Sequence, residues 1–315
     1  MKASQILIKT WLVFIHVFAF ASGIYAAPPA SPYIIVLGIA QDAGFPQAHC
    51  RKECCKDAWL DPAQRRYTSS LGLVDPDTGQ RWIFDATPDF KYQLQIVNQG
   101  QAAPDIISGI FLTHGHIGHY TGLMHVGHEV MGASGINVFA MPRMRKYLST
   151  SGPWDQLVRY KNITLQPLAD GIPVELSPNL RVTPFLVPHR DEYTETVGYK
   201  IQGPKKTVVF IPDIDKWKKW HTPIESIVAK ADRAFLDGSF YQNGEIPGRD
   251  MASIAHPFIV ESMDRFKDLP ASEKQKIYFI HLNHTNPALL PGSEARQKIL
   301  EAGFGLAEQE KIFKL

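Results

Sequence analysis

This 315-residue chain contains few cysteines and has a net charge close to zero. Its three cysteines cannot pair completely as disulfides, and all of them lie in the short segment HCRKECC. The 33 basic residues are balanced by 31 acidic ones, which leaves no basic excess of the kind that binds nucleic acid. The composition therefore gives no support to a disulfide framework or to a nucleic-acid-binding role, and we expect a small-molecule substrate.

The N-terminal segment contains the apolar run that most resembles a targeting signal. Residues 1–26 combine two lysines, an apolar stretch over residues 11–21 and a small residue at Ala26. This layout is typical of a secretory signal peptide, and the stretch is too short for a comfortable membrane span. We expect cleavage near Ala26, a mature chain of residues 27–315 without a stable membrane span, and a periplasmic or secreted location. An uncleaved N-terminal anchor is the alternative.

The order of apolar runs after residue 26 indicates one α/β domain, because no linker, repeat or low-complexity stretch divides it. Strands and helices are mixed, with early hairpin-like strands, which favours a layered sandwich. The predicted strands are 33–38, 69–74, 82–86, 109–113, 182–188, 197–203, 207–212, 234–238, 277–282 and the C-terminal KIFKL. The predicted helices are 89–97, 121–131, 223–231, 257–266 and 293–302.

Four predicted strands end in a side chain that can bind a metal. His114, His189, Asp213 and His281 each stand at or just past the C-terminal end of an apolar run. Ligand crevices of α/β sheets form at these ends of the strands. We therefore predict that the four side chains meet at one site.

The segment THGHIGHYTG adds two further imidazoles. On an extended strand end, His114 and His116 point the same way, and His119 returns to that side after a turn. Zinc binds neutral imidazole and, in catalytic sites, keeps a position open for the water that becomes the attacking hydroxide. The alternative is a set of ordinary surface or core histidines. The predicted metal ligands are His114, His116 and His189 for a first cation, His119 and His281 for a second, and Asp213 as a bridge.

The segment THGHIGH resembles the H-x-H-x-D-H signature of the metallo-β-lactamase superfamily. The later VPH, the strand-end Asp213 and FIHLNH follow in that superfamily's chain order. The resemblance implies a four-layer αββα sandwich with its metal site at one edge between the sheets. It also implies a zinc-dependent hydrolase, with one or two Zn²⁺ ions, acting on a phosphodiester, lactone or β-lactam.

A narrower resemblance links most of the mature chain to the pyrroloquinoline quinone biosynthesis protein B family. The stretches that carry it are VLGIAQDAGFPQ, ATPDF, YTGLM, GRDM and IHLNHTNP. This family lacks the paired histidines that this chain has at His114 and His116, so its biosynthetic role is not transferred. The resemblance nevertheless keeps two other functions open, a non-haem Fe²⁺ oxygenase and a non-catalytic metal-binding protein.

Gly118 departs from the superfamily signature, which has aspartate at this position. One ligand of the second cation is therefore missing from the motif. We expect the second site to be weaker, or to be completed by another carboxylate such as Asp89 or Asp42.

The cysteines resemble part of a structural zinc site in the phosphonate-pathway cyclic phosphodiesterases. That resemblance implies a closed zinc site of Cys50, Cys54, Cys55 and His284, and it leaves His281 for the catalytic site. The cysteine spacing differs from the C-x-C-x-x-C of those relatives, so a disulfide or free thiols remain alternatives. His49 is a possible substitute ligand.

His256 lies where many superfamily phosphodiesterases carry a proton-donating histidine, and we expect it to protonate the leaving group. Helix capping or simple exposure is the alternative. Asp85 and Asp237 follow strands and are expected to orient ligand imidazoles, with a place in turns as the alternative. The oligomeric state is not predicted.

Overall fold

The computed structural model describes residues 29–99 and 106–315. The predicted signal peptide, residues 1–26, lies outside the described residues. Within the described ranges, no helix combines the length and apolar character needed to cross a bilayer.

The first half of the chain builds a seven-stranded sheet whose edge strand comes from the C-terminus. In spatial order its strands are β14 (Ile312–Lys314), β1 (Tyr33–Gly38), β2 (Ser70–Asp75), β3 (Gln80–Phe84), β4 (Gly109–Phe111), β5 (Ile136–Ala140) and β6 (Ile163–Pro167). Pairing is antiparallel from β14 to β3 and parallel from β3 to β6. The carboxyl ends of β3 and β4 therefore lie at the same edge of the sheet.

The second half builds another seven-stranded sheet with the same change from antiparallel to parallel pairing. In spatial order its strands are β13 (Gly305–Leu306), β12 (Ile277–Ile280), β11 (Arg233–Asp237), β10 (Thr207–Ile211), β9 (Val197–Gln202), β8 (Leu180–Leu186) and β7 (Val174–Ser177). Strands β10 to β13 are parallel, and β8 runs in the same direction because it is antiparallel to β9. Five strands of this sheet thus end at one edge.

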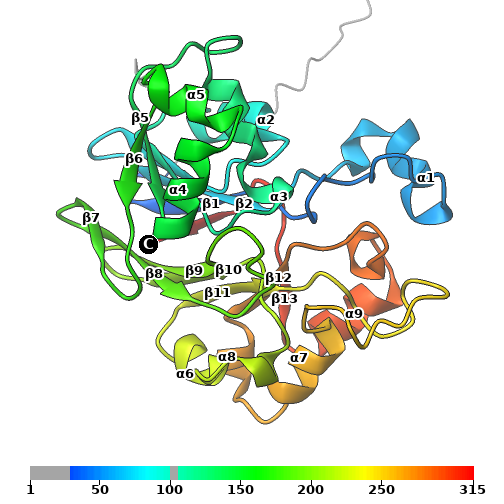
Figure 1. The fold of residues 1–315 in the computed structure, drawn as a ribbon. Coiled ribbons are helices and arrows are strands. Elements are labelled where there is room, and N and C mark those ends of the chain that lie inside the picture. Colours follow the sequence, from blue (N-terminus) through cyan, green and yellow to red (C-terminus); the bar gives the residue numbers. More distant parts are fainter. Residues whose placement is uncertain (1–28, 100–105) are drawn as a thin grey trace, which may run out of the picture.

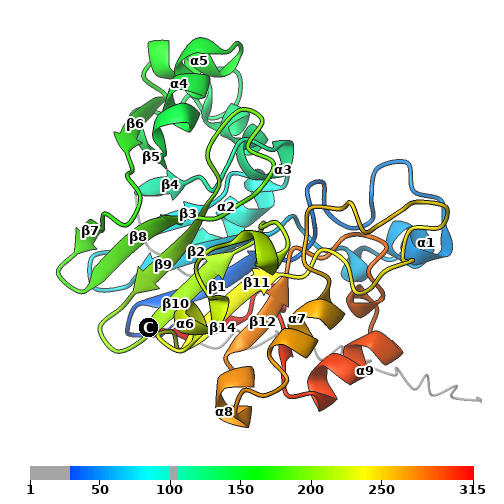
Figure 2. The same cartoon turned by 60° about the horizontal axis from the view of Figure 1, so that its bottom comes forward.

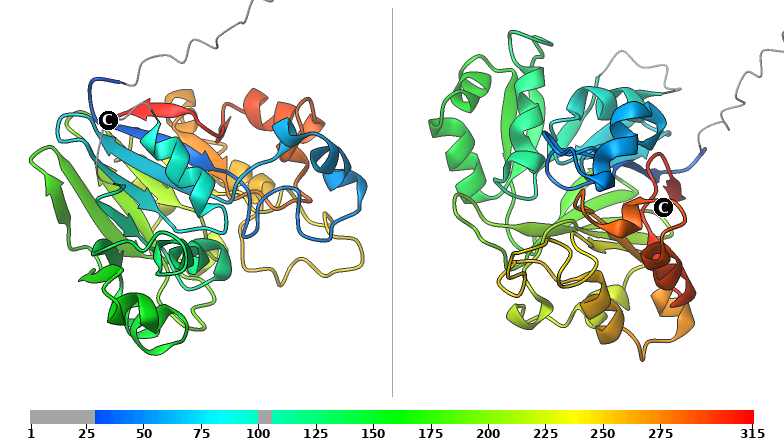
Figure 3. Two further views of the ribbon diagram at one scale, coloured as in Figure 1. Left: turned by 90° about the horizontal axis from the view of Figure 1, so that it is seen from above. Right: turned by 90° about the vertical axis from the view of Figure 1, so that its right-hand side faces the viewer.

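Helices cover the outer faces of both sheets (Figures 1 and 2). Over the first sheet lie α2 (Phe90–Asn98), α3 (Ile117–Tyr120), α4 (Pro142–Thr150) and α5 (Trp154–Arg159). Over the second lie α6 (Ile224–Val228), α7 (Ile259–Arg265), α8 (Ala271–Lys274) and α9 (Glu294–Glu301). Helix α1 (Glu53–Leu60) lies at one end of the sandwich (Figure 3, left). The predicted αββα architecture is confirmed.

Aromatic side chains fill the space between the sheets behind the carboxyl ends of β3 and β4. Phe84 and Phe111 of the first sheet stack with ring centroids 5.1 Å apart. Tyr199 of the second sheet meets both rings edge-on, at 5.3 and 5.6 Å. The Tyr199 hydroxyl donates a hydrogen bond to the carbonyl of Leu112, two residues before His114. The core thus fixes the strand end that carries the histidine motif.

The helix predicted over residues 121–131 is wrong. A 3₁₀ segment covers only Thr121–Val126. The N–H of Gly122 donates to the carbonyl of Ala86, 2.9 Å away, instead of to its own turn. A Cβ on Gly122 would lie 2.1 Å from the Thr87 carbonyl oxygen, so this close approach needs glycine.

Replacing Tyr199 with phenylalanine tests the link between the sheets. We expect the free energy of unfolding to fall by about 1 kcal/mol, and toward about 3 kcal/mol where the Leu112 carbonyl finds no other donor. Tyr160→Phe is the matched control, because Tyr160 is 59% exposed. Urea denaturation of both variants measures the difference, and equal stability of the two would contradict the role given to the hydroxyl.

Candidate metal centre

The edge where the parallel strands end carries the predicted ligands. His114 follows β4, His189 follows β8, Asp213 follows β10 and His281 follows β12. Their side chains are almost fully buried, with exposed fractions of 0 to 3%. The structure therefore brings these four strand ends together at one edge of the sandwich, as predicted.

Three imidazoles form the first group, and their ligand atoms all lie within 4.8 Å of one another: His114, His116 and His189. Nε2 of His114 lies 2.9 Å from Nδ1 of His116. The ring centroid of His189 lies 5.4 Å from that of His114 and 5.0 Å from that of His116. One cation can reach all three rings.

Two imidazoles and two carboxylates form the second group, at the same mutual spacing: Asp42, His119, Asp213 and His281. Nε2 of His119 lies 2.9 Å from Oδ2 of Asp213, and Nε2 of His281 lies 3.3 Å from the same oxygen. Asp42 enters from the loop after β1, with Oδ1 at 3.6 Å from His119 Nε2. Asp89, the other carboxylate considered for this site, instead accepts hydrogen bonds from the N–H and hydroxyl of Thr68.

Asp213 lies between the two groups, as a bridging carboxylate must. Its Oδ2 is 3.4 Å from Nε2 of His114, and its Oδ1 is 3.9 Å from Nε2 of His189. Both imidazoles belong to the first group, while His119 and His281 contact Asp213 from the second.

Several buried ligand atoms in the described residues have no hydrogen-bond partner. They are Nε2 of His119, both ring nitrogens of His189, Oδ1 of Asp213 and Nε2 of His281. A buried polar atom without a partner costs free energy, and a cation held by the ligand atoms among them would supply that partner. Neutral imidazoles with carboxylates are a donor set that Zn²⁺ and Fe²⁺ accept.

Hydrogen bonds at the carboxyl ends of β3 and β4 orient two of these rings. Asp85 accepts from the N–H and the hydroxyl of Thr113, at 2.8 and 2.9 Å. Because the Thr113 hydroxyl donates to Asp85, it accepts from Nδ1 of His114, 2.9 Å away. Nδ1 of His119 lies 2.7 Å from Asp85 Oδ2. Both rings thereby present Nε2 to the centre.

The second sheet repeats this arrangement. Ser239 donates its hydroxyl proton to Asp237 at 2.8 Å and lies 2.9 Å from Nδ1 of His281. The predicted orienting roles of Asp85 and Asp237 agree with this geometry. Ser239 and Glu192 were not predicted from the sequence. The Glu192 carboxylate lies 2.8 Å from Nε2 of His116. A hydroxyl two residues after a strand-end aspartate was the available signal for Ser239.

The pKa shifts of the rings follow their surroundings. Burial, together with the neighbouring His119, lowers the pKa of His114 well below its ordinary value, and burial lowers that of His189 to about 4. Burial also acts against charge on His119, but Asp85, Asp213 and Asp42 outweigh it and raise its pKa well above the ordinary value. His114 and His189 are therefore neutral at pH 7 without a metal, and His119 is protonated.

His256 lies beside the centre, with Nδ1 2.7 Å from Asp237 Oδ2 and 3.3 Å from Asp213 Oδ1. Its side chain is 10% exposed, and the N-cap of α7 is Phe258, so helix capping and exposure do not describe it. Burial opposes charge on His256, but Asp237 and Asp213 raise its pKa to about 9. It carries a proton at neutral pH.

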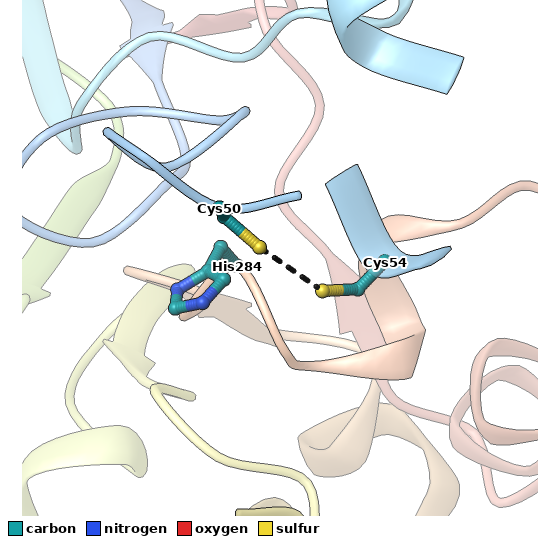
Figure 4. Close-up of side chains that lie close together, drawn as sticks. All are labelled: Cys50, Cys54 and His284. Atoms are coloured by element: carbon teal, nitrogen blue, oxygen red, sulfur yellow. Dashed lines mark hydrogen bonds between the residues drawn. The ribbon is translucent and has the colours of Figure 1, made fainter. Parts of the chain in front are cut away.

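A separate group of possible ligands joins the N-terminal loop to the segment after β12. The ligand atoms of Cys50, Cys54 and His284 lie within 4.8 Å of one another (Figure 4). The two sulfur atoms are 3.7 Å apart, and all three cysteines are free, so no disulfide joins them. His284 Nδ1 lies 3.0 Å from Asn283 Oδ1, which leaves Nε2 for a metal.

Cys55 lies outside this group, although it was predicted as the fourth ligand. Cys54 and Cys55 are neighbours on α1, where successive side chains point about 100° apart, and Cys55 packs into the main core. Burial raises the pKa of the Cys55 thiol to about 12, whereas Cys50 has its pKa lowered, against burial, by the Lys52 backbone N–H. Thiolates bind metals, so Cys50 is the better ligand. His49 is exposed and also lies outside the group.

Known proteins share both the sequence pattern and the fold. A family model described as "Beta-lactamase superfamily domain" matches residues 80–282. Curated relatives described as coenzyme PQQ synthesis protein B come from Klebsiella pneumoniae strain 342 and Methylorubrum extorquens strain PA1. They are 28% and 25% identical to the chain and cover 86% and 87% of it, over 94% and 97% of their own lengths.

Solved structures agree with the layered architecture. Zinc-bound PqqB from Methylobacterium extorquens superposes with a TM-score of 0.76 at 23% identity, covering 90% of this chain and all of that one. A diphosphatase from the PhnP family superposes with a TM-score of 0.65 at 22% identity, covering 90% and 98%. Together with the family match, they confirm the metallo-β-lactamase fold.

Metal uptake should release a proton. His119 is protonated in the metal-free protein and must be neutral to bind a cation, so zinc binding at pH 7 releases about one proton from it. The affinity accordingly rises with pH until the pKa of His119 is passed. Calorimetric titrations in two buffers of different ionisation enthalpy measure the release. It should shrink in Asp85→Asn, and an equal heat in both buffers for the unmodified protein would contradict the prediction.

The cysteine cluster gives a paired test. Cys54→Ala should lose the zinc held beside α1, whereas Cys55→Ala should retain it and lose only some stability, because Cys55 lies in the core. Metal analysis after dialysis distinguishes the two variants. Loss of zinc from both would restore Cys55 as a ligand.

Proposed function

Because this chain belongs to the β-lactamase superfamily, we propose that it is a metal-dependent hydrolase that cleaves an ester-type bond in a small molecule. One observation carries the proposal: Asp213 lies between two groups of ligand side chains, and several buried ligand atoms in these groups have no hydrogen-bond partner. Cations bound there supply Lewis acidity and lower the pKa of a coordinated water toward neutrality.

The protein's own residues prepare the site for this chemistry. Thr113, Ser239 and Glu192 hold three imidazoles by the nitrogen that faces away from the centre, so the rings do not have to reorient. The His256 imidazolium holds its Nδ1 proton against Asp237, 2.7 Å away, and can hand its Nε2 proton to the leaving group.

Hydrolysis of a phosphodiester, a lactone or a β-lactam needs the same activated water. The proposed metal centre therefore suits all three kinds of bond. Arg190 lies beside the first group, with Nη2 3.2 Å from His116 Nε2, and its side chain is 53% exposed. A guanidinium at this position suits an anionic substrate group, which favours a phosphodiester, or a β-lactam with its carboxylate, over a neutral lactone.

We also propose that the protein is exported. The support is the signal-peptide layout of residues 1–26. Mass spectrometry of protein recovered from the periplasm or medium would then find a mature N-terminus near Ala27, and recovery of the full-length chain from the cytoplasm would contradict export.

A second candidate function is an iron-dependent oxygenase. This candidate follows from the resemblance to the pyrroloquinoline quinone biosynthesis protein B family, which extends over 86 to 87% of the chain. The first group offers three imidazoles, a set that also holds Fe²⁺ with positions open.

Metal analysis and turnover together separate the two functions. Protein purified without added metal should contain zinc and should hydrolyse bis(p-nitrophenyl) phosphate, a homoserine lactone or nitrocefin. Chelation should abolish turnover and zinc should restore it. His189→Ala should behave like the chelated protein, and His221→Ala, a change at an exposed histidine, should not. Iron with oxygen consumption would instead support the oxygenase, and stoichiometric metal without any turnover would contradict both.

His256→Ala tests the proton donor. We expect turnover to fall by about 10²-fold or more for a substrate with an alkoxide leaving group, while metal content is unchanged. The loss should be smaller for a p-nitrophenyl ester, because p-nitrophenolate departs without a proton. An equal loss for both leaving groups, or no loss, would remove His256 from this role.

A further inference from the structure

Gly118 leaves a space that another residue fills. A Cβ added to Gly118 would lie 2.5 Å from Cα of Asp42 and 2.6 Å from its Oδ1. These distances are far below van der Waals contact, so no side chain fits at residue 118 while Asp42 keeps its place. Asp42 thus brings a carboxylate to the position from which the histidine motif lost one.

The Asp42 carboxylate faces the second group of ligands. Oδ1 lies 3.6 Å from Nε2 of His119 and 3.7 Å from Nε2 of His281, the same nitrogens that lie 2.9 and 3.3 Å from Asp213 Oδ2. Its side chain is 38% exposed, whereas those of His119, Asp213 and His281 are 0 to 3% exposed, so Asp42 is the member of this group nearest solvent. Burial alone would raise the pKa of Asp42, but His119 and His281 lower it well below the ordinary range.

The backbone fixes this placement. The Gln41 N–H donates to the Leu282 carbonyl at 2.9 Å, and the Leu282 N–H donates to the Ile39 carbonyl at 2.8 Å. The loop that carries Asp42 is therefore hydrogen-bonded to the segment that carries His281. Asp42 has φ +33°, a left-handed conformation that aspartate tolerates better than most residues and that is common at functional sites.

We propose that Asp42 is a ligand of the second cation and that it replaces, from a different part of the chain, the aspartate absent at Gly118. This inference rests on the proposed metal centre. The second cation then joins the loop after β1 to the histidine motif and to the segment after β12. The first group, His114, His116 and His189, does not depend on that loop, so the second cation can be lost while the first remains.

Asp42→Asn tests the inference, because asparagine keeps the size and removes the charged ligand. In titrations of metal-free protein with Co²⁺, we expect one fewer cobalt ion per chain, or a last binding step weakened by more than about tenfold, since even changes outside the coordination shell cost 10 to 100-fold. Thiolate charge-transfer bands report the cysteine cluster separately and should not change. Asp89→Asn is the matched control, because Asp89 is a nearby carboxylate that contacts Thr68 instead.

Gly118→Ala provides a second, independent test. Its methyl group would displace the Asp42 backbone, so it should remove the same cobalt ion while Asp42 itself is intact. Circular dichroism establishes that each variant is folded. Unchanged cobalt binding in Asp42→Asn would overturn the inference and leave the proposed hydrolase standing, whereas unmodified protein that binds no cobalt at its histidines would overturn the proposed function itself.

Discussion

The site depends on the contacts that the Asp213 carboxylate makes with the surrounding imidazoles. It is 3% exposed, one of its oxygens has no hydrogen-bond partner, and imidazoles approach it from both groups. Buried unpaired donors and acceptors destabilise a folded protein, and a buried negative charge is costly unless positive charge balances it. Occupancy of the centre and stability of this edge of the sandwich are therefore linked: binding a metal recovers free energy that folding alone leaves unfavourable.

The two halves of the chain solve the positioning problem in the same way. In each sheet one strand ends in an aspartate and the adjacent parallel strand ends in a histidine, with a hydroxyl between them. Asp85 after β3 reaches His114 after β4 through Thr113, and Asp237 at the end of β11 reaches His281 after β12 through Ser239. Parallel pairing brings the two strand ends together, and the hydroxyl fixes which nitrogen of the ring faces the metal.

Strand ends were predictable from the sequence, and loops were not. His114, His189, Asp213 and His281 follow apolar runs whose burial fixes their direction, so their convergence could be inferred. Glu192 was not predicted and Asp42 was named only as one of two candidate carboxylates, because both lie on loops whose path depends on contacts with distant segments, such as that between residues 41 and 282. Strands β5, β6, β7 and β13 were not predicted. The side chains of β6 and β7 are largely half-exposed or exposed, β5 alternates buried and half-buried side chains, and β13 has only two residues, so none of these segments is a long apolar run.

The superfamily match does not contain all of the proposed metal ligands of this chain. The superfamily match begins at residue 80 and ends at residue 282, so it contains the histidine motif but not Asp42, Cys50 or Cys54. If Asp42 holds the second cation, the carboxylate lost at Gly118 inside the match is supplied by a loop outside it. That loop also carries Cys50 and runs into α1, which carries Cys54. His284, whose ligand atom lies close to those of both cysteines, is three residues after His281. The number of cations in the active centre is then set by an N-terminal segment outside the superfamily match, and a change in that segment can alter the chemistry while every strand-end histidine stays in place.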